Sequence, residues 1–253
     1  MRLARGTARY LPATRDSIVH TFSICAVDSG RRIVGAATAS RYIAVGSLVP
    51  HLEVGAGVVL TQSIANPPFG PRGLLLLRAG TAPDAVIESL LERDEKRELR
   101  QIAVLSHAGA YATHTGSDCI SETSEHAEKG VVALGNTLVS DQTAPVMVRA
   151  YRESLEGLPQ PEAHRSVRAE SETRANCNRI ARALIAALRA GEDAGGDSRG
   201  KQAAALLVKG PNAGFGGNGD VAVDLRVDDH ADPVNELSRI FDLFLESQEE
   251  DSE

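Results

Sequence analysis

Two runs of apolar residues near the start of the chain have the length and composition of buried strands. The first covers residues 21–27 and the second residues 33–39, with a short polar turn between them. Runs of this kind, bounded by turn residues, are typical of strands that are buried on both faces. The pair therefore predicts a hairpin that begins at Thr21 and ends next to Ser40 and Arg41.

The later strand-like segments are also short apolar runs between turn residues. Several of them follow one another as hairpins instead of alternating strictly with helices. This order indicates an α+β protein with stacked antiparallel sheets and helical layers outside them. The predicted strands lie at residues 52–65 (one or two strands), 101–106, 110–116, 131–136, 202–208 and 221–227.

Helices are predicted where apolar residues recur every three or four positions. Asn66 and the prolines up to Pro71 are expected to break regular structure, since proline lacks a donor and restricts the preceding residue. Thr81 and Asp232 stand where caps would begin two helices, and Gly191 stands where a third would end. The predicted helices cover residues 73–78, 82–91, 142–155, 176–190 and 233–244, and the polar residues 159–175 predict a surface insertion.

Length and composition predict a single folded domain. The chain has 253 residues, of which 42% are hydrophobic, and no linker divides it. We expect the domain to cover residues 21–246, followed by an acidic tail over residues 247–253. Residues 1–20 are rich in arginine and lack the apolar stretch of a secretory signal. They predict a disordered extension or a start codon placed too early, although their composition also resembles an organelle transit peptide.

Charge, apolar run lengths and cysteine spacing each bear on possible partners. The formal net charge of −7 argues against nucleic acid, because phosphate binding needs a clustered basic face. No apolar run approaches the ~20 residues of a membrane span, so no membrane partner is expected. Cys25, Cys119 and Cys177 are far apart in sequence and form no CxxC motif. This spacing argues against a disulfide framework or a zinc site and favours a reducing cytoplasm.

Two glycine-rich segments favour different interpretations. Residues 214–219 match GxGxxG, but they precede a predicted strand instead of opening a helix. A flexible loop is therefore preferred to a dinucleotide site. Residues 195–202 combine two glycines with Asp197, Arg199 and Gln202 at the start of a buried strand. A turn with positive φ explains the glycines, whereas the three polar side chains favour a substrate-binding site.

An acidic segment near the C-terminus has two interpretations. Asp224, Arg226 and Asp228 share one face of a predicted strand, and Asp229 and His230 follow them. The carboxylates and the imidazole could hold a hard metal ion, which would make the protein a metal hydrolase. Alternatively, Arg226 neutralises the carboxylates in ion pairs. We favour the ion pairs and predict neither a metal nor another cofactor.

Taken in order along the chain, these motifs resemble those of the domain of unknown function 1028 family, an N-terminal nucleophile (Ntn) hydrolase-like group. The resemblance runs from residue 21 to about residue 245. It implies a four-layer αββα sandwich of the Ntn-hydrolase type and a homo-oligomer. The blocks that carry it are residues 21–24, 39–41, 44–46, 61–67, 70–73, 99–101, 114–116, 135–136, 195–202 and 224–230.

The resemblance implies a catalytic role for Thr21. In Ntn hydrolases the N-terminal residue supplies a hydroxyl nucleophile and a free α-amine with a pKa of about 8, which can act as the base. By analogy, the reaction would be hydrolysis of a non-peptide or short-peptide amide in a small-molecule substrate through a threonine ester. Arg41 would orient the amine, Asn66 or Asn136 would donate to the oxyanion, and Gln62 would line the substrate pocket.

Two features depart from the pattern that the resemblance implies. Related chains commonly start with Met-Thr, whereas His20 precedes Thr21 here, so removal of a methionine would not expose the amine. Proteasome-like relatives place an aspartate and a lysine near the nucleophile, where this chain has Ala39 and Arg41, and its first lysine is Lys96. The alternative is a non-catalytic small-molecule-binding or assembly protein on the same scaffold.

Overall fold

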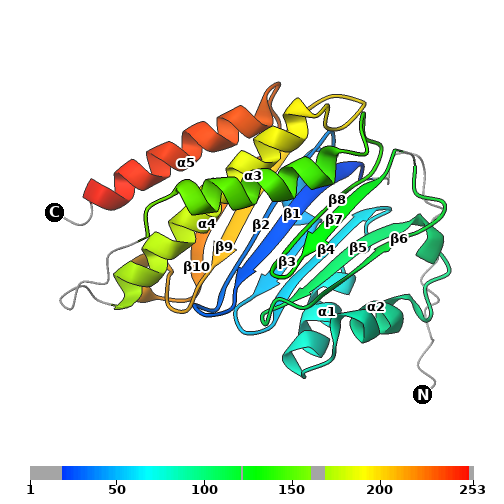
Figure 1. Cartoon of the computed structure of the whole chain (residues 1–253), viewed down its shortest axis with the longest axis horizontal. Helices are drawn as coiled ribbons and strands as arrows, with labels where there is room; N and C mark the ends of the chain where they lie inside the picture. Colours follow the sequence, from blue (N-terminus) through cyan, green and yellow to red (C-terminus); the bar gives the residue numbers. More distant parts are fainter. Residues whose placement is uncertain (1–18, 121, 161–168, 251–253) are drawn as a thin grey trace, which may run out of the picture.

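The structure of the protein is a computed structural model that describes residues 19–120, 122–160 and 169–250 (Figure 1). Most of the predicted N-terminal extension therefore lies outside the described residues. The same holds for residues 161–168 of the predicted insertion and for the last three residues of the acidic tail. Val19 and His20, the last two residues of the predicted extension, are described and buried.

Ten strands in the described residues form two antiparallel sheets (Figure 1). A six-stranded sheet has the order β10-β9-β2-β1-β8-β7, and a four-stranded sheet has the order β3-β4-β5-β6. In the first hairpin, Thr21 pairs with Ser40. The strands are β1 Thr21–Asp28, β2 Ile33–Ser40, β3 Pro50–Glu53, β4 Gly57–Ser63, β5 Arg100–Ser106, β6 Tyr111–Thr115, β7 Ser124–Glu128, β8 Val131–Gly135, β9 Ala203–Lys209 and β10 Val221–Val227.

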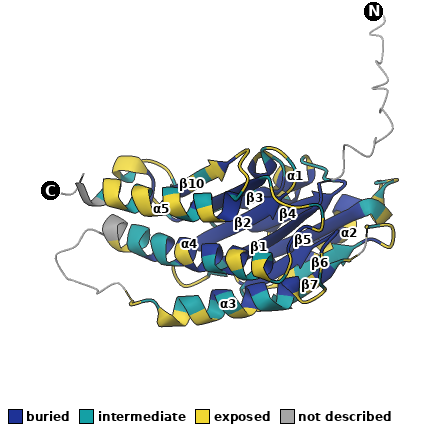
Figure 2. Ribbon diagram, turned by 90° about the horizontal axis from the view of Figure 1, so that it is seen from above, coloured by how far each residue is buried: buried dark blue, intermediate teal, exposed yellow. Residues whose placement is uncertain are grey.

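Helices cover the outer face of each sheet (Figures 1 and 2). Three of them pack on the six-stranded sheet, where their apolar residues form one cluster with the outward side chains of β1 and β2. The other two pack on the four-stranded sheet over a separate cluster. The helices are α1 Phe69–Arg78, α2 Pro83–Leu91, α3 Thr143–Gly157, α4 Ala169–Asp193 and α5 Pro233–Glu250.

A third apolar cluster lies between the two sheets and contains many small side chains, such as Ala36, Ala103 and Ala205. Figure 2 shows the strands as a buried layer between helices whose outer surfaces are exposed. The prediction of an α+β protein with two antiparallel sheets is confirmed. Assignment of this arrangement to the Ntn-hydrolase type stays a prediction.

Several predicted helix ends are wrong. Helix α1 begins at Phe69 and contains Pro71, because a proline in the first turn occupies a position whose N–H has no helical partner. Thr81 does not cap α2, whose N-cap residue is Ala82. Helix α4 starts at Ala169, inside the segment predicted to be a polar insertion, and continues past Gly191.

Gly191 serves close packing instead of ending the helix. A Cβ atom there would lie 2.8 Å from Met147, which is closer than such atoms approach, and 3.1 Å from Phe22, which is tighter than most carbon–carbon contacts. The chain leaves α4 at Gly195 and Gly196, which have φ values of +114° and +56°. These left-handed conformations favour glycine and turn the chain towards Asp197.

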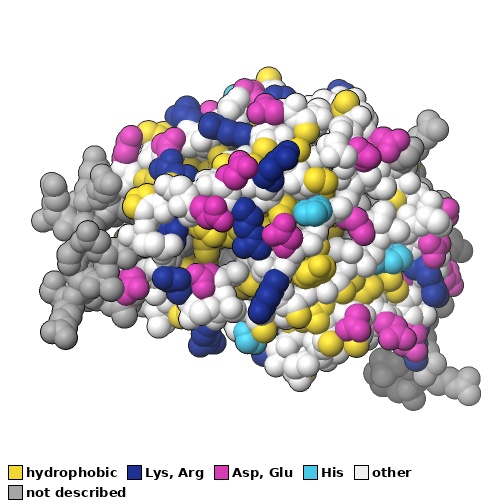
Figure 3. All heavy atoms as spheres, viewed as in Figure 1, with side chains coloured by type: hydrophobic (Ala, Val, Ile, Leu, Met, Phe, Trp, Pro, Cys, Tyr) yellow, Lys and Arg dark blue, Asp and Glu magenta, His cyan; other side chains and the backbone are white. Residues whose placement is uncertain are grey.

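The surface gives limited information on partners. No helix in the described ranges is both long and apolar enough to cross a lipid bilayer. On the face shown in Figure 3, basic and acidic side chains are interspersed. The expectations that the protein binds no nucleic acid, forms a homo-oligomer and resides in the cytoplasm stay predictions.

Candidate active site around Thr21

Thr21 begins β1, and its side chain belongs to the side of the sheet that faces the other sheet. Phe22 packs against the helices, whereas Cys25 packs between the sheets. Since side chains alternate along a strand, Thr21 shares the side of Cys25. Thr21 is completely buried, and its hydroxyl donates a hydrogen bond of 3.1 Å to the carbonyl of Val19. Its nitrogen is in the peptide bond with His20.

Val19 connects the start of β1 to the opposite sheet. Its N–H donates to the carbonyl of Ser63 in β4, and its own carbonyl accepts from the Ser63 N–H at 3.1 Å. The side chain of Val19 is 2% exposed and packs in the cluster between the sheets. The chain therefore passes from a bridge with the four-stranded sheet at Val19 into the six-stranded sheet at Thr21.

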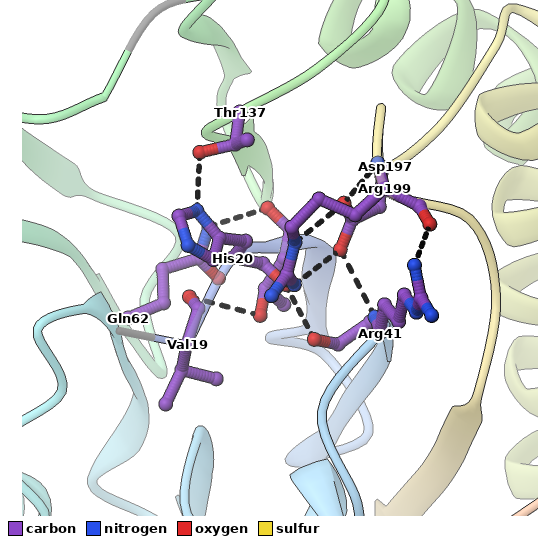
Figure 4. Close-up of polar contacts among 9 residues, drawn as sticks. Val19, His20, Arg41, Gln62, Thr137, Asp197 and Arg199 are labelled. Carbon is purple, nitrogen blue, oxygen red and sulfur yellow. Dashed lines mark hydrogen bonds and ion pairs between the residues drawn. The ribbon is translucent and has the colours of Figure 1, made fainter. Parts of the chain in front are cut away.

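The carbonyl and the ring of His20 are both hydrogen-bonded (Figure 4). The carbonyl accepts from the hydroxyl of Ser40 and, at 3.4 Å, from Nη2 of Arg199. The ring nitrogen Nδ1 shares a hydrogen bond with the hydroxyl of Thr137. The carbonyl group that is bonded to the Thr21 nitrogen is thus held by two side-chain donors.

Asp197 positions the guanidinium that reaches His20 (Figure 4). The Asp197 side chain is 1% exposed, and it accepts from Nε and Nη2 of Arg199 at 3.1 and 2.7 Å. It also accepts from the backbone N–H of Arg41 at 3.0 Å, a contact between residues 156 positions apart. A paired carboxylate of this kind holds a guanidinium in one orientation. Three of the predicted site residues are therefore brought together beside Thr21.

Two glutamines form a polar seam between the sheets, next to Thr21. Gln62 accepts from the hydroxyl of Ser23 at 2.7 Å and donates to the Thr21 carbonyl at 3.2 Å. It also donates to Oε1 of Gln101 at 2.9 Å, and Gln101 donates to the carbonyl of Gly135 at 2.9 Å. Both glutamines are completely buried. Gln62 therefore supports the backbone of Thr21 as well as facing the space between the sheets.

Asn136 extends this seam and retains one free polar atom. Its backbone N–H donates to the carbonyl of Thr21, and its Nδ2 donates to Oε1 of Gln101, both at 3.0 Å. Its Oδ1 is buried and has no hydrogen-bond partner among the described residues. Nδ2 of Asn136 faces Oε1 of Gln101. If the nitrogen and oxygen of the Asn136 amide were exchanged, two acceptor oxygens would face each other. The unused atom beside Thr21 is therefore an acceptor, whereas the predicted oxyanion role requires a donor.

Asn66 lies on the other side of the four-stranded sheet. Its N–H donates to the hydroxyl of Thr61, and its side chain lines a cavity of about 720 Å³ together with Phe69 and Arg100. Thr61 and Gln62 are consecutive in β4 and point to opposite faces. The structure therefore does not bring the predicted oxyanion donor Asn66 to the side of the sheet that carries the Thr21 site.

Arg41 and Gln202 lie at the rim of the site. The Arg41 guanidinium donates to the carbonyl of Arg199, so it is directed towards that loop. Gln202 donates to Asp229 at 3.1 Å and, with Arg41 and His230, lines a cavity of about 280 Å³. This cavity adjoins the polar cluster around Asp197 through Arg41. A role for Arg41 in orienting an amine stays a prediction.

The acidic segment forms an ion pair in the structure. Arg226 donates to both oxygens of Asp224, at 2.8 and 3.1 Å. The hydrogen bond to Asp224 raises the pKa of Arg226, and the charge of Asp228 adds a smaller effect in the same direction. Within the described part of the chain, no group of three or more histidine, cysteine or acidic residues could hold a metal ion. The geometry favours the ion-pair interpretation.

The environment of His20 predicts a pH-dependent stability. Burial and the positive charge of Arg199 lower the pKa of His20, although the Asp197 carboxylate acts in the opposite direction. A histidine whose pKa is lower in the folded state stabilises the fold fully above its unfolded pKa of about 6.5 and progressively less below it. In a chain that retains residues 1–20, we therefore expect His20→Gln to flatten the fall in stability between about pH 7 and pH 5.

Urea unfolding midpoints over this pH range would test the prediction for His20. His107→Gln, in an exposed turn, is the matched control and should keep the pH dependence of the unchanged protein. An equal fall in the His20→Gln variant would show that the buried imidazole does not contribute to it.

The geometry defines an α+β protein with a buried threonine and a polar cluster at one end of two packed antiparallel sheets. The chain belongs to the family of unknown function DUF1028, which it matches over residues 21–237. The crystal structure of a protein from Silicibacter pomeroyi, assigned to the same family, is similar with a TM-score of 0.70 and 26% identity over 88% of each chain. No curated protein matches. Family membership is confirmed, and the Ntn-hydrolase-like assignment stays a prediction.

The sequence analysis assigned no site role to four residues that contact this region. Ser40 and Thr137 hold His20, and Ser23 and Gln101 complete the polar seam. A partial signal was available, because Gln62 and Gln101 each lie in a predicted strand, near the apolar residues 58–60 and 102–105. A buried amide needs partners, so two such amides in neighbouring strands indicate a polar seam.

Proposed function

We propose that the protein is an Ntn-type amidohydrolase in which Thr21 is the nucleophile. The observation that carries this proposal is the carbonyl of His20, which is bonded to the nitrogen of Thr21 and accepts from Ser40 and Arg199. Acyl transfer needs a hydroxyl next to a carbonyl whose oxygen is stabilised by donors. In the proposal, Ser40 and Arg199 take the oxyanion role that the sequence analysis gave to asparagines.

The arrangement of the layers also supports the proposal. Helices lie outside two packed sheets, and Thr21 stands at the head of a central strand with its side chain on the inter-sheet side. This placement is what the four-layer αββα sandwich of the Ntn type requires. The match to the family begins at Thr21. The description of the family names no activity.

The proposed reaction converts an amide and water into a carboxylic acid and an amine. The oxygen of Thr21 bonds to the amide carbon while the carbon–nitrogen bond breaks. The hydroxyl proton passes through the α-amine of Thr21 to the leaving nitrogen. Water then attacks the threonine ester, which releases the acid and restores the hydroxyl. Since the α-amine is in a peptide bond with His20, that bond must first be broken.

One observation favours the alternative of a non-catalytic binding protein. Thr21 is completely buried, and Val19 and His20 are packed and hydrogen-bonded in front of it. A protein that keeps this arrangement would have no free amine. It would bind a small molecule at the rim, near Asp197 and the cavity lined by Gln202, without turnover.

The N-terminus of the purified protein distinguishes these functions. For the hydrolase, we expect intact mass and N-terminal sequencing of protein made from the native gene to show a chain that begins with Thr21. Such a chain should also form one acyl adduct with a β-lactone, an electrophile that acylates hydroxyl nucleophiles. A chain that retains residues 1–20 and forms no adduct would contradict the hydrolase and support the binding protein.

A further inference from the structure

We infer that Val19 and His20 occupy the acyl-binding half of the substrate site, and that the site accepts peptide-like amides with an extended backbone and a polar planar ring next to the scissile carbonyl. This inference rests on the proposed function for the position of the reacting carbonyl. The contacts themselves are independent of any chemistry at Thr21. The Val19 backbone, the His20 carbonyl and the His20 ring each have their own hydrogen-bond partners, and each would have a counterpart in a bound substrate.

The backbone of Val19 occupies a place for an extended peptide. Ser63 donates to the Val19 carbonyl and accepts from the Val19 N–H, which is the pairing of two antiparallel strands. Recognition of this kind requires an amide with both a donor and an acceptor. The Val19 side chain is buried between the sheets, so this position favours an apolar group. A simple acyl chain would leave Ser63 without these two hydrogen bonds.

The position of His20 defines the group that carries the scissile carbonyl. Ser40 and Arg199 hold its carbonyl oxygen, and Asp197 fixes the guanidinium of Arg199. His20 is 7% exposed, and its imidazole shares a hydrogen bond with the hydroxyl of Thr137. A hydroxyl can donate or accept, so it suits a ring that has a nitrogen in its edge. The site therefore selects a planar polar ring at this position.

Backbone strain marks the same two contacts. Ser63 and Thr137 have φ values of +64° and +56°, in the left-handed region that residues other than glycine rarely adopt. The conformation is especially unusual for Thr137, which is β-branched. Strained residues persist where the surrounding structure requires them, and they concentrate at binding sites. Both residues that receive the Val19-His20 segment are thus held in unfavourable conformations that present their polar groups to it.

Hydrogen exchange can test the inference without measuring activity. The test uses the Thr21→Ala chain, which lacks the proposed nucleophile, after intact mass has shown that it retains residues 1–20. Its Ser63 N–H, which bonds to the Val19 carbonyl, should exchange slowly. Val19→Asp places a charge in the apolar space between the sheets and should displace the segment, so Ser63 should exchange at least about tenfold faster. Val104 in β5 reports whether the fold is intact. Leu75→Asp, which adds the same charge on an exposed part of α1, is the matched control.

Adding acetyl-Val-His-amide to the Val19→Asp protein should restore slow exchange at Ser63. Acetyl-Pro-His-amide lacks the N–H that pairs with Ser63, and acetyl-Val-Ala-amide lacks the ring, so each should restore it less. If Val19→Asp also exposes Val104, the milder Val19→Gly should show the same changes in smaller degree.

Three results would overturn the inference. Unchanged exchange at Ser63 in both Val19 variants would show that the segment does not hold the site. No protection by acetyl-Val-His-amide at millimolar concentration would exclude the peptide site, and equal protection by acetyl-Val-Ala-amide would exclude ring selection. These results are distinguishable from failure of the proposed function, because peptide binding does not require a free amine on Thr21.

Discussion

Replacing Thr21 with alanine is expected to lower amide hydrolysis by at least about 10³-fold. Loss of the attacking hydroxyl removes the covalent step, and only binding and oxyanion stabilisation remain. Thr21→Ser keeps a hydroxyl on the same carbon and should retain part of the activity. The measurement is amine release from a panel of fluorogenic peptide amides, together with the yield of the β-lactone adduct.

The matched control for Thr21 is Thr38→Val. Thr38 is a buried threonine in β2 whose hydroxyl contacts Ser23 at 2.9 Å, so this variant removes a hydroxyl from the same inter-sheet space. It should keep its activity and its adduct. Equal activity of Thr21→Ala and the unchanged protein would exclude Thr21 as the nucleophile, whereas equal losses in both variants would indicate a structural effect.

Replacing Asp94 with alanine is expected to destabilise the protein by about 3–5 kcal/mol, because it leaves a buried guanidinium without its partner. Arg100 has a side chain that is 2% exposed, and it donates to Asp94 from Nε at 2.7 Å and from Nη2 at 3.1 Å. Its third nitrogen donates to the carbonyl of Ile64, and the guanidinium lies 5.8 Å from the ring centre of Phe69. Urea unfolding would measure the loss.

A double replacement tests whether the unpaired charge causes this loss. Asp94→Leu combined with Arg100→Met removes both charges, and its stability should lie much closer to that of the unchanged protein. A double variant as unstable as Asp94→Ala would show that packing matters more than charge.

The same pair adds a pH dependence below neutrality. Burial opposes ionisation of Asp94, but hydrogen bonds from Arg100 and from the Lys96 backbone outweigh it, so the pKa of Asp94 is lowered. Stability from a lowered carboxyl pKa is present above the unfolded value and is lost as the pH falls through the folded value. Asp94→Asn should therefore show a smaller loss on acidification.

The segments that the sequence predicts well are those whose apolar spacing is set by burial. The first hairpin is one example, because every residue of β2 is buried. Strand β7 was not predicted, since it lies at the edge of its sheet and has the polar sequence SEHAE. The first turns of α4 were missed for a similar reason, because residues 169–175 are mostly polar.

The site was only partly predictable because its contacts join distant parts of the chain. The residue types of Asp197 and Arg199 and their place after two glycines predicted a site, and the structure places both in one polar cluster; their role in substrate binding stays a prediction. Their contacts with Arg41 and His20 depend on how β9 pairs with β2, which no local pattern specifies. Asn66 and Asn136 both lie at the end of a predicted strand, yet only Asn136 contacts Thr21, through a hydrogen bond from its N–H to the Thr21 carbonyl.

The seam between the sheets has a consequence for how the two sheets are aligned. Packing among small side chains such as Ala36, Ala103 and Ala205 is non-directional and would tolerate one sheet sliding over the other. Gln62 and Gln101 do not tolerate this, because a shift would separate their buried amides from Ser23 and from the carbonyl of Gly135. The two glutamines thus fix the register of one sheet against the other. The position of Thr21, the proposed nucleophile, therefore depends on Gln62 and Gln101 without any contact between them and a substrate.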